Sequence, residues 1–146
     1  MKLSARSRYG VRMMLELALN YEKGAVFLKD IAKKEEISEK YLSQLVIPLK
    51  AAGLINSIRG AHGGYMLAKE PDEISLKNII EVLEGELDLV NCVKDSSLCN
   101  RVSVCITRGV WTKLGDKVKE VLDSFTLGDL VKEYEKNEDA LLMYNI

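Results

Sequence analysis

Residues 53–68 read GLINSIRGAHGGYMLA, with two short apolar stretches on either side of a glycine-rich segment. The stretches 54–58 and 65–68 have the composition of strands, and the glycines between them allow the chain to reverse tightly. The pattern therefore predicts a β-hairpin with residues 60–64 at its tip. Gly53, just before the hairpin, is suited to end a helix in a left-handed conformation.

Three helices are predicted upstream of this hairpin. Apolar residues recur at helical spacing over residues 3–21, 28–35 and 38–52, and Ser38 is a suitable N-cap for the third helix. Pro48 removes one backbone hydrogen bond from the third helix, so we expect a kink or a loosened turn in its second half. Two short helices joined by a tight turn and followed by a hairpin have the order of a winged helix-turn-helix.

Downstream, the periodicity predicts a short helix over 75–83, no regular element over 86–102 and one long helix over 103–124. A last short helix is expected from Thr126, which forms a capping-box pattern with Asp129. The long helix would reach about 30 Å, too far for a small head to cover, so we expect a second copy of the chain to cover it. The predicted fold is mainly α with a small β wing, divided into a winged helix-turn-helix head (1–84), a cysteine-bearing loop (85–105), and a dimerisation helix with a C-terminal helix (103–146).

The charge is distributed unevenly along the chain. The net charge is -1, yet residues 1–70 carry twelve Lys and Arg against seven Asp and Glu, whereas the rest carries nine against fifteen. Local field matters more than total charge for an anionic polymer, so the front half is the candidate nucleic-acid surface. No secretory or membrane-spanning pattern is found, and we expect a cytoplasmic protein.

The start of the third helix carries the side chains that would read bases. In a helix-turn-helix this end of the second helix enters the major groove. Glutamine can bind adenine in a bidentate way, serine and lysine can bond base edges, and lysine or tyrosine can reach phosphate. An ordinary solvated face is the alternative. The candidates are Ser38, Lys40, Tyr41, Ser43 and Gln44.

The hairpin and the N-terminus supply further candidates. Arg59 precedes the glycine-rich tip, and arginine is favoured in a narrow minor groove by the negative potential there. His62, the single histidine, is expected to contact the DNA backbone more readily than a metal ion. Lys2 and Arg8, with Arg6 and Arg12, would contact phosphates and make binding salt-dependent.

The three cysteines, Cys92, Cys99 and Cys105, fall within one loop and the start of the following helix. An odd number in a cytoplasmic chain argues against a disulfide framework. Three thiolates in a loop of small and polar residues suit the iron of an iron–sulfur cluster. A thiol switch, a zinc site and inert cysteines remain as alternatives.

The chain resembles the IscR-type family of winged-helix iron–sulfur transcriptional regulators, whose relatives include NsrR and CymR. The resemblance covers nearly the whole chain and rests on residues 1–4, 8–11, 37–38, 41–45, 52–54, 57–65 and 126–130, with Trp111 and the three cysteines. It implies a homodimer on an imperfectly palindromic operator in double-stranded DNA, with the third helix in the major groove and Arg59 in the minor groove. It also implies that Cys92, Cys99 and Cys105 ligate the cluster, with [2Fe-2S] favoured and [4Fe-4S] possible.

One position departs from the family pattern. A histidine three residues after the last cysteine completes the cluster in IscR-type proteins, and Arg108, a cation that cannot ligate, stands there in this chain. The fourth ligand is therefore open. Asp95, a group from the second subunit such as Ser7 or Glu16, and a small exogenous ligand are the candidates.

The sequence predicts a DNA-binding repressor whose operator affinity is controlled by a cluster that senses iron–sulfur status, redox state or nitric oxide. A metal-free cysteine thiol switch on the same DNA-binding head is the alternative. A small iron–sulfur electron-transfer protein is a remote third hypothesis, because it leaves the wing without a purpose. We find no nucleophile–base pair or phosphate loop and expect no enzymatic activity.

Overall fold

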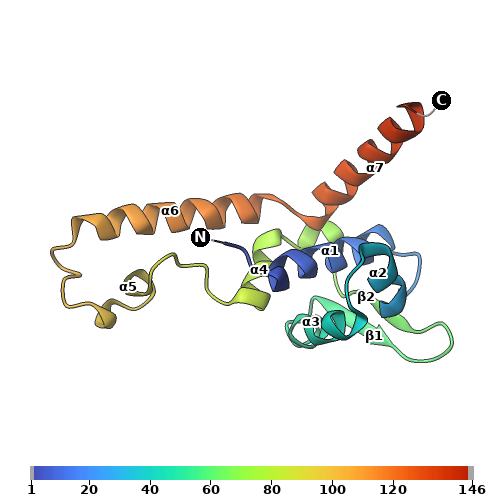
Figure 1. Ribbon diagram of the computed structural model, residues 1–146, viewed down its shortest axis with the longest axis horizontal. Helices are drawn as coiled ribbons and strands as arrows, with labels where there is room; N and C mark the ends of the chain where they lie inside the picture. The colour runs from blue at the N-terminus through green and yellow to red at the C-terminus, as the bar shows by residue number, and fades with distance from the viewer. Residues whose placement is uncertain (1, 145–146) are drawn as a thin grey trace.

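The computed structural model describes residues 2–144 and confirms the predicted winged-helix architecture, mainly helical with one two-stranded antiparallel sheet (Figure 1). In chain order the elements are α1 (Ala5–Leu19), α2 (Leu28–Glu35), α3 (Glu39–Ala51), β1 (Ile55–Ile58), β2 (Gly64–Leu67), η1 (Pro71–Glu73), α4 (Leu76–Glu84), α5 (Asn91–Lys94), η2 (Ser96–Leu98), α6 (Ile106–Ser124) and α7 (Leu127–Tyr144). We call residues 2–85 the head and residues 86–124 the arm.

The head has one hydrophobic core between α1, α3, α4 and the wing. Met14 of α1, Leu42, Leu45 and Leu49 of α3, and Ile79 of α4 are fully buried. These residues lie on the apolar faces that their helical spacing predicted. Burial of each such side chain contributes about 1.5–3 kcal/mol relative to exposure, so this core fixes where α3 lies in the head.

The wing is the antiparallel pair β1 and β2, in which Ile55 is opposite Leu67 and Ser57 is opposite Tyr65. Val26, just before α2, pairs with Tyr65 on the other side and ties the wing to the helix-turn-helix. Gly64 has a φ of 136°, and a Cβ there would overlap the carbonyl of Val26. Only glycine allows this close approach of the two backbones.

The arm leaves the head after Gly85 as an extended segment that runs alongside α6 (Figure 1). The Nζ of Lys119 pairs with Asp88 at 2.8 Å and holds the segment against the helix. The predicted long helix begins at Ile106, three residues later than expected, because Cys105 has extended backbone and serves as its N-cap. The segment predicted to be irregular contains two single turns, α5 and η2.

The chain returns from the arm to the head through two backbone hydrogen bonds. The Leu76 amide donates to the Phe125 carbonyl at 2.8 Å, and the Leu127 amide donates to the Ile74 carbonyl at 2.9 Å. The predicted capping box forms, since the amide of Thr126 donates to Asp129 at 2.9 Å. These bonds join the end of α6 directly to the core of the head.

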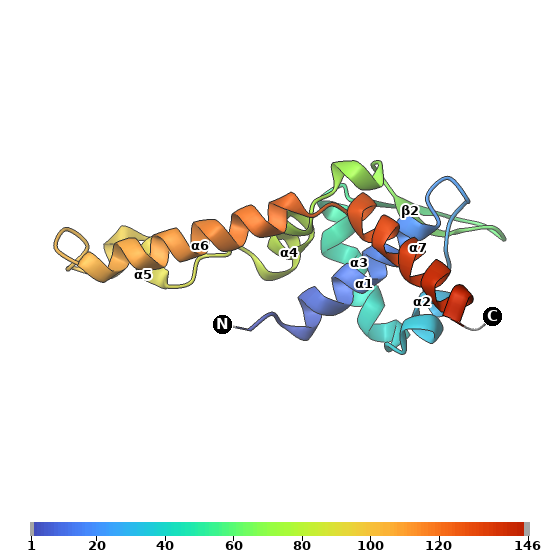
Figure 2. The same cartoon turned by 90° about the horizontal axis from the view of Figure 1, so that it is seen from above.

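The C-terminal helix α7 differs from the short helix expected. It spans 18 residues and packs against α1 and η1 of the head, as Figure 2 shows from above. Its first residue, Leu127, is fully buried in the head core. The described residues include no helix long and apolar enough to span a bilayer.

Candidate nucleic-acid interface and cysteine arm

The start of α3 presents a polar face to solvent. The Oγ of Ser38 accepts a hydrogen bond from the Tyr41 amide at 3.3 Å, as predicted for an N-cap. Lys40, Ser43 and Gln44 are exposed, and we call them the reading face. They lie opposite the buried Leu42, Leu45 and Leu49, so the face is free to enter a groove while the core holds the helix.

Tyr41 is placed differently from the other candidates of α3. It is half-buried, and its ring packs edge-on against Tyr9 of α1 with the ring centroids 5.7 Å apart. The guanidinium of Arg12 lies over the Tyr9 ring at 5.5 Å. Tyr41 therefore anchors the start of α3 to α1, a contact that its spacing along the sequence did not reveal.

The wing tip is exposed at the end of the hairpin. Both Arg59 and His62 are exposed, at the end of a hairpin that extends beyond the helices (Figure 1). A Cβ at Gly63 would overlap the carbonyl of Ile58, which explains why the tip must stay narrow. The Nζ of Lys50 donates to the Oγ of Ser57 at 2.7 Å and ties α3 to the wing strand.

The four cations near the N-terminus divide into two pairs. Arg6 donates to the Leu83 carbonyl at 3.0 Å, and Arg12 pairs with Glu35 at 2.8 Å. Lys2 and Arg8 are exposed. The structure thus engages Arg6 and Arg12 inside the head and leaves Lys2 and Arg8 accessible to phosphate.

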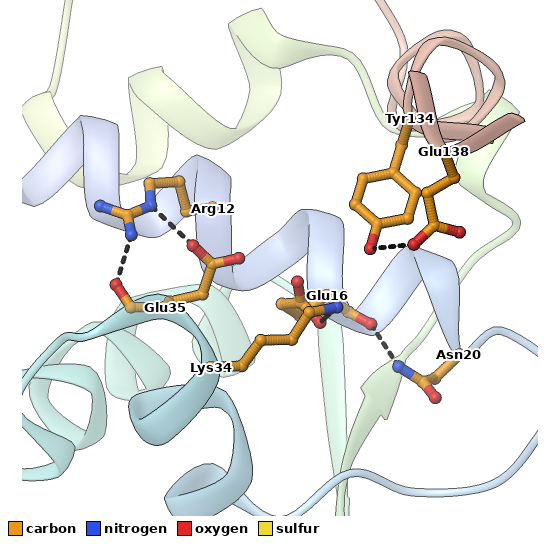
Figure 3. A network of polar contacts seen from close by, with 7 residues as sticks. All are labelled: Arg12, Glu16, Asn20, Lys34, Glu35, Tyr134 and Glu138. Atoms are coloured by element: carbon orange, nitrogen blue, oxygen red, sulfur yellow. Dashed lines mark hydrogen bonds and ion pairs between the residues drawn. The ribbon is translucent and has the colours of Figure 1, made fainter. Parts of the chain in front are cut away.

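A polar network joins α1, α2 and α7 (Figure 3). Glu16 of α1 is almost fully buried and pairs with Lys34 of α2 at 2.9 Å. Burial raises the pKa of Glu16, and Lys34 opposes this shift. Lys34 also lies 5.3 Å from the ring of Tyr134, whose hydroxyl donates to Glu138. The network links α2, the first helix of the helix-turn-helix, to α1 and to α7.

The arm places its three cysteines on different local elements. Cys92 lies on α5, Cys99 ends η2, and Cys105 caps α6; all three are half-buried free thiols. Across residues 2–144, no three His, Cys, Asp or Glu side chains lie close enough together to hold a metal ion. The donor chemistry suits an iron–sulfur cluster, but this arrangement does not gather the thiols into a ligand set.

Cys105 has the most distinctive surroundings of the three. Its Sγ lies 3.3 Å from the Oγ1 of Thr107. The Thr107 hydroxyl, then the Arg108 amide, lower the pKa of the Cys105 thiol, and Arg101 adds a smaller electrostatic effect. A lowered thiol pKa increases the thiolate fraction, which is the form that binds metals and reacts with oxidants.

The candidate fourth ligands are already engaged within the chain. Asp95 accepts from the amide and hydroxyl of Ser97, and these bonds lower its pKa. Ser7 is buried and donates to Glu84 at 2.7 Å, while Glu16 pairs with Lys34. Arg108 donates to the Cys92 carbonyl at 3.2 Å, so it holds the loop together where a ligand was expected.

Comparison with known proteins decides the family. Residues 3–133 match the profile of Rrf2, described as an iron-dependent transcriptional regulator. This chain belongs to the Rrf2 family of transcriptional regulators. It is 44% identical over 144 residues to the HTH-type transcriptional regulator CymR of Bacillus subtilis, covering 99% of each chain. It is 37% identical over 135 residues to IscR of Escherichia coli, covering 92% of this chain and 83% of that relative.

Solved structures agree with this assignment and confirm the resemblance seen in the sequence. The structure of CymR, the global cysteine regulator of B. subtilis, aligns with a TM-score of 0.77 at 46% identity, covering 91% of this chain and 98% of that one. IscR of T. potens aligns with a TM-score of 0.78 at 42% identity, covering 94% and 90%. This Rrf2-family protein is thus similar to both CymR and IscR along nearly its whole length.

The sequence missed several positioning residues of this Rrf2-family protein. The pairing of Glu16 with Lys34 and of Arg12 with Glu35 joins α1 to α2 through residues 18 and 23 positions apart, beyond the reach of helical spacing. One signal was present for Cys105, because Thr107 follows two residues later at the start of a predicted helix. Helix starts are where hydroxyls and free amides stabilise thiolates.

Proposed function

We propose that this Rrf2-family regulator is a cytoplasmic homodimeric repressor that binds a palindromic operator in double-stranded DNA. The observation that carries the proposal is the exposed polar reading face of α3 together with an exposed arginine on the wing. Lys40, Ser43 and Gln44 would contact base edges and phosphate in the major groove, and Arg59 would enter the adjacent minor groove. Ser38, Tyr41, His62, Lys2 and Arg8 would position the head on the backbone.

The second subunit would cover the apolar face of α6. Ile106 is 91% exposed, and Val110, Leu114 and Val121 are each about half exposed on the same helix. An apolar face of this kind on an isolated helix is unstable in water and is typical of a protein–protein interface. Two antiparallel or crossed arms would set the spacing between the two reading faces.

For the input, we propose that Cys92, Cys99 and Cys105 hold an iron–sulfur cluster, [2Fe-2S] or [4Fe-4S], with the fourth position filled from outside the arm. Support comes from three soft thiols on one arm and from the similarity to IscR. When bound, the cluster would supply a site whose charge and integrity respond to iron–sulfur status, oxidants or nitric oxide. The arm's own residues would transmit the change.

In this proposal, a change in the arm would reach the head through two sets of hydrogen bonds. Phe125 and Leu127 bond to Ile74 and Leu76 at the end of α6. At the root of the arm, Glu84 accepts from the amide of Ser4 at 3.0 Å, next to the segment carrying Lys2. A shift of the arm would therefore move both the N-terminal cations and the spacing of the reading faces, which is the differential contact that regulation needs.

A metal-free thiol switch is the second candidate. The lowered pKa of Cys105 favours it, as does the similarity to CymR, which is described as a global cysteine regulator. In this alternative, oxidation of Cys105 would alter the arm directly, and Cys92 or Cys99 would be its disulfide partner.

Anaerobic purification separates these two inputs. Iron and acid-labile sulfide would be measured together with the visible spectrum, in the wild type and in Cys99→Ala. A cluster predicts a coloured wild type and loss of iron in the variant. Colourless, iron-free wild type whose operator affinity changes on oxidation would overturn the cluster and support the thiol switch.

The DNA-binding head is tested by operator affinity. Arg59→Ala is expected to weaken binding by about tenfold or more, whereas Lys136→Ala, on the exposed side of α7, changes it little. Affinity should also fall steeply with salt, since counterions are released from DNA on binding. Equal effects of the two substitutions would refute the assignment of the wing.

A further inference from the structure

Ile47 lies at the centre of the exposed side of α3. It follows Ser43 by four residues and Gln44 by three, so the three side chains share one face of the helix. Its side chain is 69% exposed, the largest value for any large apolar residue of the described head. The reading face thus contains one bulky apolar group among polar ones.

The stability of the helix does not account for an isoleucine at this position. Ile47 makes no contribution to the buried side of α3, where Leu42, Leu45 and Leu49 form the core. A β-branched residue also has a lower helix propensity than alanine, and Pro48 follows it directly. An exposed Ile here slightly disfavours the helix and adds nothing to the core, which leaves a contact outside the chain as the role to test.

The chemistry of the major groove limits what that contact can be. Base edges there present hydrogen-bond donors and acceptors, and the C5-methyl group of thymine is the apolar group among them. We propose that Ile47 is a specificity-determining residue that packs on a thymine methyl next to the base pairs contacted by Ser43 and Gln44. This inference rests on the proposed entry of α3 into the major groove.

The same side chain would discriminate against other bases. Cytosine carries a hydrogen at C5 where thymine carries the methyl group, so an isoleucine there would lose its apolar contact. This loss of the methyl contact is what would distinguish thymine from cytosine at that position. Ile47 therefore selects an A·T pair at a fixed place in each half-site.

The test removes single methyl groups from the operator. A high-affinity duplex is first selected from a random pool with the full-length protein, and each thymine of both half-sites is then replaced by deoxyuridine. We expect one thymine whose replacement weakens wild-type binding by about fourfold for each half-site. Ile47→Ala should bind the thymine operator more weakly. It should be insensitive to deoxyuridine at that one position and keep the wild-type response at the other thymines.

Two further variants make the outcome decisive. Ile47→Val, which keeps most of the apolar surface, should retain sensitivity to deoxyuridine, and Leu141→Ala, an exposed apolar residue of α7, should behave as wild type. Identical deoxyuridine profiles for wild type and Ile47→Ala would overturn the role of Ile47. If Gln44→Ala and Arg59→Ala also leave affinity unchanged, the proposed docking of α3 fails as well. If these two variants lose affinity while the deoxyuridine profiles of wild type and Ile47→Ala are identical, only the methyl contact is overturned.

Discussion

The head and the arm differ in what covers their apolar side chains. In the head, Leu45, Leu49 and Ile79 are fully buried by neighbouring elements of the same chain. In α6 of the arm, Gly115 is the single buried residue, and Ile106 and Leu114 face solvent. The apolar side chains of the head are covered within one chain, with Leu127 of α7 completing the core, whereas those of α6 would be covered by the proposed second subunit.

The charged side chains within the head also divide into two groups. Inside the head, Glu16 pairs with Lys34 and Arg12 pairs with Glu35, and these contacts hold α1 and α2 together. Lys40 and Arg59 stay exposed on the side of the reading face and wing. The head therefore separates ion pairs that position its helices from cations available to DNA.

The core of the head should give the largest effect on stability. Leu45→Ala is expected to lower the free energy of unfolding by about 2–5 kcal/mol, because it leaves a cavity in a close-packed core. Urea denaturation followed by circular dichroism measures this change. Leu141→Ala, at an exposed site on α7, is the control and should change stability by less than about 0.5 kcal/mol. Equal losses for both variants would contradict the division between core and surface.

A substitution on the apolar face of α6 should weaken dimerisation without unfolding the head. Leu114→Glu is expected to raise the dimer dissociation constant about a hundredfold, since an unpaired carboxylate would be buried in an apolar interface. Sedimentation velocity measures the change, and the head should keep its helical signal. Asp123→Lys changes the charge at an exposed position on the other side of α6 and should remain dimeric. A fully dimeric Leu114→Glu would show that α6 is not the interface.

Local pattern was enough to predict the elements of the head. The N-cap at Ser38, the buried face of α3 and the hairpin follow from short-range spacing and from glycine positions, so they were correct. The length of α7 and its packing on α1 were not predicted, because they depend on contacts between residues more than a hundred positions apart.

The same limit applies to the candidate site. Sequence identified Arg6 and Arg12 only as cations, and their partners Leu83 and Glu35 are set by tertiary packing. The grouping of the cysteines along the chain was visible, but their positions in space are set by tertiary contacts within the arm, such as the bond from Arg108 to the Cys92 carbonyl.

The network in the head should show an intermediate effect that depends on pH. Lys34→Met leaves Glu16 buried without its cation, and we expect a loss of about 1–2 kcal/mol at pH 7, reduced from a fully buried pair because Lys34 is half exposed. Burial already raises the pKa of Glu16 from 4.5, so the folded state favours the neutral form more than the unfolded chain does. The deficit should therefore be absent below the ordinary glutamate pKa and grow as pH rises through the raised value.

Lys33→Met is the matched control for this measurement. Lys33 is an exposed neighbour on α2, and its removal should cost little at any pH. Urea unfolding of both variants at several pH values separates the two cases. A deficit in Lys34→Met that stays constant between acid and neutral pH would show that the loss comes from packing and not from the charge of Glu16.

The smallest effect is expected at the thiol that caps α6. Thr107→Val keeps the shape of the side chain and removes the hydroxyl that is the main cause of the lowered pKa of Cys105. The pKa should rise toward the ordinary thiol value of 9.0, so a smaller thiolate fraction is present at neutral pH. Alkylation by iodoacetamide, measured against pH in a Cys92→Ser, Cys99→Ser background, should become slower at pH 7 and unchanged well above the pKa.

Thr112→Val removes a hydroxyl on the same helix that bonds only the Arg108 carbonyl, and it should leave the profile as it is. If Thr107→Val also has no effect, the arm does not activate Cys105, and the thiol switch loses the observation that favours it.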